Sequence, residues 1–195
     1  MTELFLLRHG QTAMNSAFAL QGRSDHPLNE IGKVQADTAG TWFRKKGIHF
    51  VRVYSSPLSR AIQTAKAVVN QGSIHVDQRL IEMDYGPYEG EDIRTPSPEL
   101  SAFFQDMLHQ SVPDGMEPLD AVVERLGSFL EELRREAPEG SILVSTHAIA
   151  MKGALEYLTP MSQGSYWSKH IGNCTVYRTI LQNGKYTVPV QVYPE

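Results

Sequence analysis

The sequence contains very little cysteine: Cys174 is the only one among 195 residues. A single cysteine excludes an internal disulfide and any metal cluster built on several cysteines, and it is typical of a reducing compartment. Long hydrophobic runs are also missing, because no stretch approaches the roughly 18 apolar residues of a membrane span. The start, MTELFLLRHG, lacks the basic segment of a secretion signal. We therefore expect a cytoplasmic location and no membrane partner.

Positive charge is not in excess either. The formal net charge is -4, with 18 lysines and arginines against 22 acidic residues, and there is no run of basic residues. Proteins that bind nucleic acid through general electrostatic attraction usually present a basic surface. We therefore expect no nucleic-acid partner, and any strong anion site must be local and built from a few cations.

Strands and helices alternate along most of the chain, without internal repeats. Short apolar runs and the helical spacing of apolar residues predict the elements. Strands are expected at 3–7, 51–56, 73–77 (short or at an edge) and 141–146, with two more around the turn at 183–184, and helices at 29–47, 57–69, 117–135 and 148–158. This alternation predicts a three-layer α/β/α sandwich around a mainly parallel sheet. The length suits one domain with a sizeable core.

The first two helices carry more detailed expectations. Asn29 is a suitable N-cap for the first helix. Ile31, Val34, Thr38 and Trp42 recur there at helical spacing, so we expect them on its buried face. Pro57 suits the first position of the second helix, because its missing N–H and fixed φ are tolerated there.

Basic residues stand where several predicted elements meet the carboxyl edge of this sheet. Arg8 and His9 end the first strand. Arg60 lies in the first turn of the helix after the second strand, and His147 follows the strand SILVST. Ligands of such sheets bind beyond the carboxyl ends of the strands, where helix N-termini also gather, and arginine forks bind oxyanions bidentately. Taken singly, each residue could be a surface cation or a core histidine; together they predict a site for a phosphoryl group.

Five ordered segments resemble the histidine phosphatase superfamily, the phosphoglycerate mutase-like proteins. They are LLRHGQTAMN, QGRSDHPLNEIGKVQA, SSPLSRAIQTA, RLIEMDYGPYEG and VSTH, followed by Asn173. The first fits the family pattern R-H-G-x-T-x-x-N. The resemblance implies a phosphoglycerate mutase-like fold with residues 1–195 as a single histidine phosphatase domain. It also implies a reaction that needs no metal or other cofactor and acts on a small phosphorylated substrate.

The same resemblance implies roles for individual residues. His9 would be the nucleophile and would carry a phosphohistidine intermediate. Arg8, Arg60 and His147 would hold the phosphoryl oxygens and offset the charge of the transition state. Glu82 would protonate the leaving oxygen and later take a proton from water.

Two other carboxylates remain rivals of Glu82 for the acid role. Asp84 is the stronger one, because strand-like spacing would point it to the same side as Glu82, and Glu89 is the other. Glu82 and Asp84 could also be ordinary solvated loop carboxylates.

The resemblance also places substrate-binding residues. Asn15 would help to bind the phosphoryl group, and Gln21 and Gly22 would contact the part of the substrate that does not react. The stretch from about 85 to 115 is irregular and is expected to be a cap or loop excursion with one helix. Its aromatic residues, Tyr85, Tyr88, Phe103 and Phe104, could form an apolar wall for the substrate or could simply pack the excursion onto the sheet.

Three departures from the family pattern bear on function. Ala148 stands where a glycine usually follows the second histidine, and we expect this change to be tolerated. Met83 and Asp84 replace the Arg-His pair of the cofactor-dependent mutases, and like-charge repulsion from Asp84 disfavours a substrate with several negative groups. Glu117 and Pro118 stand where a Gly-Gly-Glu-Ser sequence is usual.

These features favour hydrolysis of a small phosphomonoester over phosphoglycerate mutase-type transfer, which remains the alternative. A third reading, from another class, is a catalytically weak phosphate-binding module. A dinucleotide-binding oxidoreductase is a poorer fit, because no G-x-G-x-x-G follows the first strand.

Overall fold

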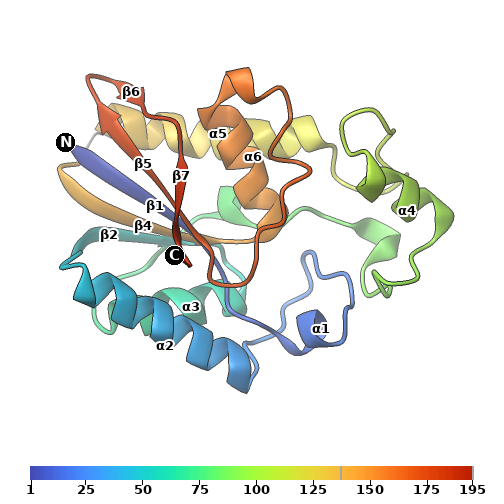
Figure 1. Ribbon diagram of the computed structural model, residues 1–195, viewed down its shortest axis with the longest axis horizontal. Helices are drawn as coiled ribbons and strands as arrows, with labels where there is room; N and C mark the ends of the chain where they lie inside the picture. The colour runs from blue at the N-terminus through green and yellow to red at the C-terminus, as the bar shows by residue number, and fades with distance from the viewer. Residues whose placement is uncertain (137, 195) are drawn as a thin grey trace.

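The computed structural model describes residues 1–136 and 138–194 (Figure 1). The strands are β1 (Thr2–Arg8), β2 (Phe50–Ser55), β3 (His75–Val76), β4 (Gly140–Thr146), β5 (Val176–Gln182), β6 (Lys185–Tyr186) and β7 (Val190–Tyr193). The α-helices are α1 (Ala13–Ser16), α2 (Glu30–Lys45), α3 (Ser59–Val69), α4 (Pro98–Gln105), α5 (Leu119–Glu136) and α6 (Ala148–Leu158). Short 3-10 helices lie at η1 (Gln78–Leu80), η2 (Gly86–Tyr88) and η3 (Pro160–Ser162).

All the strands belong to one mixed sheet. Its order is β3-β2-β4-β1-β5-β6, and β7 also pairs with β5. The first four strands of this order run parallel, whereas the pairs that β5 makes with β1, β6 and β7 are antiparallel. The expected mainly parallel sheet is thus confirmed for its central part. The chain after 171 forms three strands, however, and not the two that we predicted.

Helices cover both faces of the sheet, as Figure 1 shows with α2 and α3 on one side and α5 and α6 on the other. The central strand β1 serves both layers, because its side chains alternate. Leu4 and Leu6 join the hydrophobic cluster under α5 and α6. Phe5 and Leu7 join the cluster under α2 and α3. The predicted α/β/α sandwich is therefore confirmed, and its sheet lies between two buried cores.

The buried face of α2 differs from the prediction. Ile31 and Val34 are 58% and 65% exposed. The helix instead buries a face of small residues and one phenylalanine: Gly32, Ala36, Ala39, Gly40 and Phe43. A Cβ atom on Gly32 would lie 2.0 Å from the carbonyl oxygen of Gln11. The helix therefore packs through close backbone approach rather than through large apolar side chains.

Two predicted helix starts are displaced. Pro57 precedes α3, whose N-cap is Leu58, and the Ser59 N–H donates to the Asp25 carboxylate over 2.7 Å. Helix α5 begins at Leu119, two residues later than expected. Both helices still lie in the predicted parts of the chain, and only their first residues differ. A helix boundary depends on local capping partners, which the spacing of apolar residues does not reveal.

The excursion at 85–115 contains η2 and α4 and lies at one end of the sheet (Figure 1). Leu100 and Phe103 of α4 are fully buried and join the cluster under α5 and α6. Main-chain hydrogen bonds also tie it to the loop after α1: Leu20 N–H donates to Glu91, and Gly90 N–H donates to Leu20. The excursion is therefore a packed wall at the carboxyl ends of the strands. Among residues 1–136 and 138–194, no helix is long and apolar enough to cross a membrane.

Candidate active site

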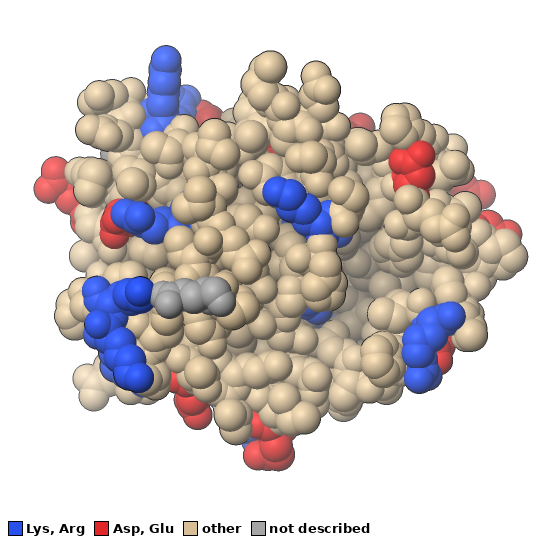
Figure 2. All heavy atoms as spheres, viewed as in Figure 1, with Lys and Arg blue, Asp and Glu red and all other residues tan. Residues whose placement is uncertain are grey.

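The carboxyl ends of β1 and β4 meet the N-termini of α3 and α6 at one edge of the sheet (Figure 1). Arg8 is the last residue of β1, and the His9 N–H donates to the Thr146 carbonyl over 3.0 Å. Arg60 is the second residue of α3, and His147 is the N-cap of α6. The structure thus brings together the four basic residues that the sequence placed at this edge. Figure 2 shows the surface hollowed beside the excursion, with basic atoms at the bottom of the hollow.

The orientation of the His9 ring is fixed by two neighbours. Its Nδ1–H donates to the Gly10 carbonyl over 2.7 Å, so Nε2 carries the lone pair, and Nε2 accepts from Arg60 Nε over 3.3 Å. The side chain is only 3% exposed. Burial, reinforced by the charges of Arg8 and Arg60, holds the pKa of His9 well below its usual range. The imidazole is therefore neutral with Nε2 free to act as a nucleophile.

Arg60 is fully buried and links both histidines to the loop after α1. Its Nε donates to both histidines, over 3.3 Å to His9 and 3.2 Å to His147 Nδ1. Its other two nitrogens donate to the carbonyls of Gly22 (2.6 Å) and Ser24 (2.8 Å). The fork therefore holds the loop after α1 against the histidines, and its charge lies on a side chain that is not exposed to solvent.

The second histidine, His147, has the opposite tautomer. Its Nδ1 accepts from Arg60, so Nε2–H donates to the Ser56 hydroxyl over 2.7 Å. Burial, followed by the charge of Arg60, holds the pKa of His147 well below its usual range. The next residue, Ala148, is the first residue of α6 and has no positive φ. Alanine in place of the family's glycine therefore strains no backbone here.

Glu82 lies against the N-terminus of α6. Its carboxylate accepts hydrogen bonds from the N–H groups of Ile149 (3.2 Å) and Ala150 (2.9 Å), and from its neighbour Met83 (2.8 Å). It is only 3% exposed. A helix N-terminus favours a carboxylate, so α6 positions Glu82 beside His147.

The rival carboxylates are held elsewhere. Asp84 does not share the side of Glu82, as strand-like spacing suggested: its half-exposed carboxylate pairs with Arg23 over 3.2 Å. Its other oxygen accepts from the Gly86 N–H at the start of η2 over 2.8 Å, so both oxygens are bound away from Glu82. Glu89 accepts from the Gly22 N–H and from the Ser24 hydroxyl. Neither rival is buried as Glu82 is, and together with Arg23 and Glu117 they are called the rim below.

The predicted substrate-binding residues Asn15, Gln21 and Gly22 lie in the segment between β1 and α2. The Asn15 side-chain oxygen accepts from the Thr12 N–H (3.2 Å) and from the Asn173 amide (3.3 Å). Gln21 is buried, and its oxygen accepts from the Thr12 hydroxyl over 2.7 Å. Gly22 has both main-chain groups occupied, by Glu89 and Arg60. A Cβ there would lie 2.7 Å from the Met83 carbonyl oxygen, so this position needs glycine for a close approach.

Sequence reasoning did not identify Ser56 and Lys152. Ser56 follows β2 at the same edge of the sheet as His147, and this position was the signal that could have found it. Lys152 is the only basic residue in the otherwise mostly apolar helix α6. In the part of the chain that the structure describes, no group of three or more His, Cys, Asp or Glu residues is placed to hold a metal ion.

A mixed α/β sheet with two arginines and two histidines at the carboxyl edge of its central strands agrees with the phosphoglycerate mutase-like class, to which relatives at 32% identity belong. The chain belongs to the histidine phosphatase superfamily (branch 1), whose family model matches residues 4–192.

Relatives with different names share most of the chain. A putative phosphoserine phosphatase 2 of Hydrogenobacter thermophilus is 28% identical over 193 residues, which cover 96% of this chain and 94% of the relative. A probable phosphoglycerate mutase GpmB of Yersinia pestis is 32% identical, covering 93% and 86%. A crystallised phosphoserine phosphatase mutant of Entamoeba histolytica, in complex with phosphoserine, shares the fold with a TM-score of 0.83 at 23% identity, over 98% and 95% of the two chains.

Proposed function

We propose that this protein hydrolyses a small phosphomonoester through a phosphohistidine on His9. The observation that carries the proposal is the position of Arg60 Nε, which lies within hydrogen-bond distance of both His9 Nε2 and His147 Nδ1. A phosphoryl group on Nε2 would have its oxygens between these side chains, where a buried guanidinium offsets their charge. Membership of the histidine phosphatase superfamily supports the same reaction.

The reaction has two displacements at phosphorus. First, His9 Nε2 attacks the phosphorus, the bond to the alcohol oxygen breaks, and Glu82 gives its proton to that oxygen. Then water attacks the phosphohistidine, Glu82 takes a proton from the water, and the P–N bond breaks to release inorganic phosphate. Each displacement is easier than direct attack by water on the ester.

Two buried donors support the substrate-binding roles of Arg8 and Gln21. Arg8 Nε and Gln21 Nε2 make no hydrogen bond to any atom of the described residues. Buried donors without an acceptor are costly and uncommon. Phosphoryl or ester oxygens of a bound substrate would satisfy them. Asn15, whose oxygen is already held from two sides, would present its amide N–H to the same ligand.

The charge at the rim favours a substrate with a single phosphate. Arg94, the one arginine of the excursion, is exposed and pairs with Asp92. Arg23 at the rim is shared by Asp84 and Glu117. These cations are already neutralised, so a second phosphate would meet carboxylates without a compensating charge. Phosphoglycerate mutase-type phosphoryl transfer is the second candidate, because some of the relatives are named probable phosphoglycerate mutase.

The decisive experiment measures inorganic phosphate released in EDTA from a panel of phosphomonoesters. The panel includes phosphoserine, an activated aryl phosphate, and 3-phosphoglycerate with and without 2,3-bisphosphoglycerate. Phosphate release from one member at a rate that His9→Ala abolishes supports the proposal. Interconversion of the phosphoglycerates without release makes the protein a mutase, and binding of phosphate without either reaction makes it a phosphate-binding module.

A further inference from the structure

One lysine is hydrogen-bonded to a segment of the chain that also contacts residues of the active site. Lys152 lies on α6, half-buried, and its Nζ donates to the carbonyl of Trp167 over 2.7 Å. Burial lowers the pKa of Lys152 to about 8, while Glu82 raises it and Arg8 lowers it. Its ammonium therefore lies in the electric field of two residues of the active site. Keeping a charged amine in such a place is costly, and perturbed amines of this kind concentrate at functional sites.

The partner of Lys152 belongs to a connection between α6 and β5, residues 159–175. Two side chains of α6, Lys152 and Glu156, bind this connection. They are four residues apart, so they lie on the same face of the helix. Glu156 accepts from the N–H groups of Gly164 (3.0 Å) and Tyr166 (2.6 Å). Lys152 supplies the next contact, at Trp167. The connection is thus fixed to the helix that begins at His147.

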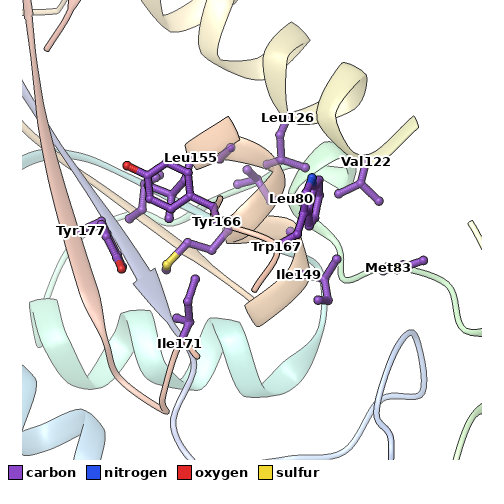
Figure 3. Close-up of a cluster of buried hydrophobic side chains, with 14 of the residues drawn as sticks. Leu80, Met83, Val122, Leu126, Ile149, Leu155, Tyr166, Trp167, Ile171 and Tyr177 are labelled. Atoms are coloured by element: carbon purple, nitrogen blue, oxygen red, sulfur yellow. The ribbon is translucent and has the colours of Figure 1, made fainter. Parts of the chain in front are cut away.

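The C-terminal part of the connection is hydrogen-bonded to Arg8 and His9. The Ile171 carbonyl accepts from the Arg8 guanidinium, and the Asn173 amide donates to the His9 carbonyl over 3.1 Å. Between these anchors, Trp167 and Ile171 are buried, and Figure 3 shows both in the hydrophobic cluster with Ile149 of α6. Trp167 and the carbonyl that accepts from Arg8 thus belong to one short segment whose two ends are packed into the same cluster.

We propose that Lys152 is a positioning residue of the active site, which fixes the connection at Trp167 so that the Ile171 carbonyl holds Arg8 toward the phosphoryl group. This inference rests on the proposed function. It adds a residue that touches neither the nucleophile nor the substrate. Its effect is on orientation, and displacement of a catalytic group by about 1 Å can reduce a rate by as much as about 100-fold.

The test compares Lys152→Met and Lys152→Arg, with Lys169→Met as the matched control. Lys169 lies on the same connection, but it is exposed and its Nζ lies over the Tyr166 ring at 4.3 Å. We expect Lys152→Met to lower kcat by about tenfold or more with a smaller change in KM, because Arg8 acts most strongly in the transition state. Lys152→Arg, which keeps the charge and the donor, should recover most of the rate, and Lys169→Met should match the wild type.

A second readout separates this inference from the proposed function. In a Trp42→Phe background, Trp167 is the sole tryptophan, so its fluorescence reports the connection directly. Lys152→Met should shift this emission without phosphate present, whether or not the protein is a phosphatase. An unchanged emission together with an unchanged kcat would overturn the inference. Equal loss in Lys152→Met and Lys152→Arg, accompanied by early thermal unfolding of both, would also overturn it and leave Lys152 a purely structural residue. If the wild type itself releases no phosphate, the proposed function fails instead.

Discussion

The base and the rim of the hollow are built from similar residue types but in different surroundings. The base consists of four buried side chains, none more than 3% exposed: His9, Arg60, Glu82 and His147. The rim consists of Arg23, which pairs with Asp84 and Glu117, and of Glu89, which accepts from the Gly22 N–H. Arg23 and Asp84 have 40% and 43% of their side chains exposed.

This difference in burial predicts different roles for the two parts: the base for the rate of the reaction, and the rim for the choice of ester. Charges in the base act through a low dielectric and are held by several hydrogen bonds each, so their effect on a developing negative charge is large. Ion pairs at the rim are screened by water, and such pairs typically contribute only about 0–1 kcal/mol. We therefore expect changes in the base to abolish turnover and changes at the rim to alter mainly which ester is used.

The largest effect is expected for Arg60→Ala. This change removes the donor shared by both histidines and the two bonds to the loop at Gly22 and Ser24. We expect kcat/KM to fall by about 10³-fold or more, as for other arginines that stabilise phosphoryl transfer. The measurement is steady-state kinetics on the best ester, with unfolding curves to show that the variant remains folded.

Arg52→Ala is the matched control for this substitution. Arg52 lies on β2 and pairs with Glu136, with 38% of its side chain exposed. Its loss should leave kcat/KM within about twofold, because a screened surface pair contributes little. Similar losses in the two variants would contradict the special role of Arg60, because removal of an arginine outside the site would then have the same effect.

The next effect is expected for Glu82→Gln, with Asp84→Asn as its counterpart at the rim. Glutamine keeps the shape of Glu82 but cannot give or take the proton. We expect alkyl esters, which have poor leaving groups, to react about 100-fold more slowly, and an activated aryl phosphate to change much less. Asp84→Asn should change the rates of both substrates only slightly. Should the alkyl esters slow in Asp84→Asn instead, the acid role would pass to Asp84.

A smaller effect is expected in the pH dependence of stability. His9 and His147 have a lowered pKa when folded, from burial and neighbouring arginines, against about 6.5 when unfolded. Below that value the unfolded chain binds protons that the folded chain does not, so the free energy of unfolding falls as pH falls, by up to about 1.4 kcal/mol per pH unit for each histidine. Above about pH 7.5 the two histidines contribute no slope.

Urea unfolding between pH 7.5 and 5.5 measures this effect. The slope should be shallower in His147→Gln than in the wild type, because one of the two contributions is removed. The control His49→Gln, at an exposed position, should keep the wild-type slope. A wild-type slope in His147→Gln would show that His147 takes up a proton in the folded protein.

The base was more predictable from sequence than the packing around it. His9 and His147 follow strands and Arg60 lies in the first turn of a helix, so their meeting at one sheet edge follows from chain order. Glu82 lies in the loop after η1 and was expected only from the family resemblance. The face of α2 was predicted wrongly, because the apolar stripe at Ile31 and Val34 is exposed while Gly32 and Gly40 are buried. Small residues carry almost no hydrophobic signal, yet they allow the closest backbone contacts.

The rim was the least predictable part of the site. Asp84 was expected beside Glu82 because extended chains alternate their side chains, but its carboxylate binds the Gly86 N–H and Arg23 instead. Lys152 and Ser56 act through partners distant in sequence, the Trp167 carbonyl and the His147 ring. The Lys152 contact depends on the tertiary fold, so no local pattern in the sequence could report it, whereas Ser56 could have been found from its position after a strand at this edge of the sheet.

The most direct test of the account is to trap the phosphorylated enzyme. Wild-type protein is mixed with its best ester, quenched in alkali, digested, and analysed by mass spectrometry for the phosphorylated residue. The account predicts a phosphoryl group on His9 alone, absent in His9→Ala even though that variant still binds inorganic phosphate or vanadate. A phosphoryl group on His147, or turnover by His9→Ala at the wild-type rate, would contradict it.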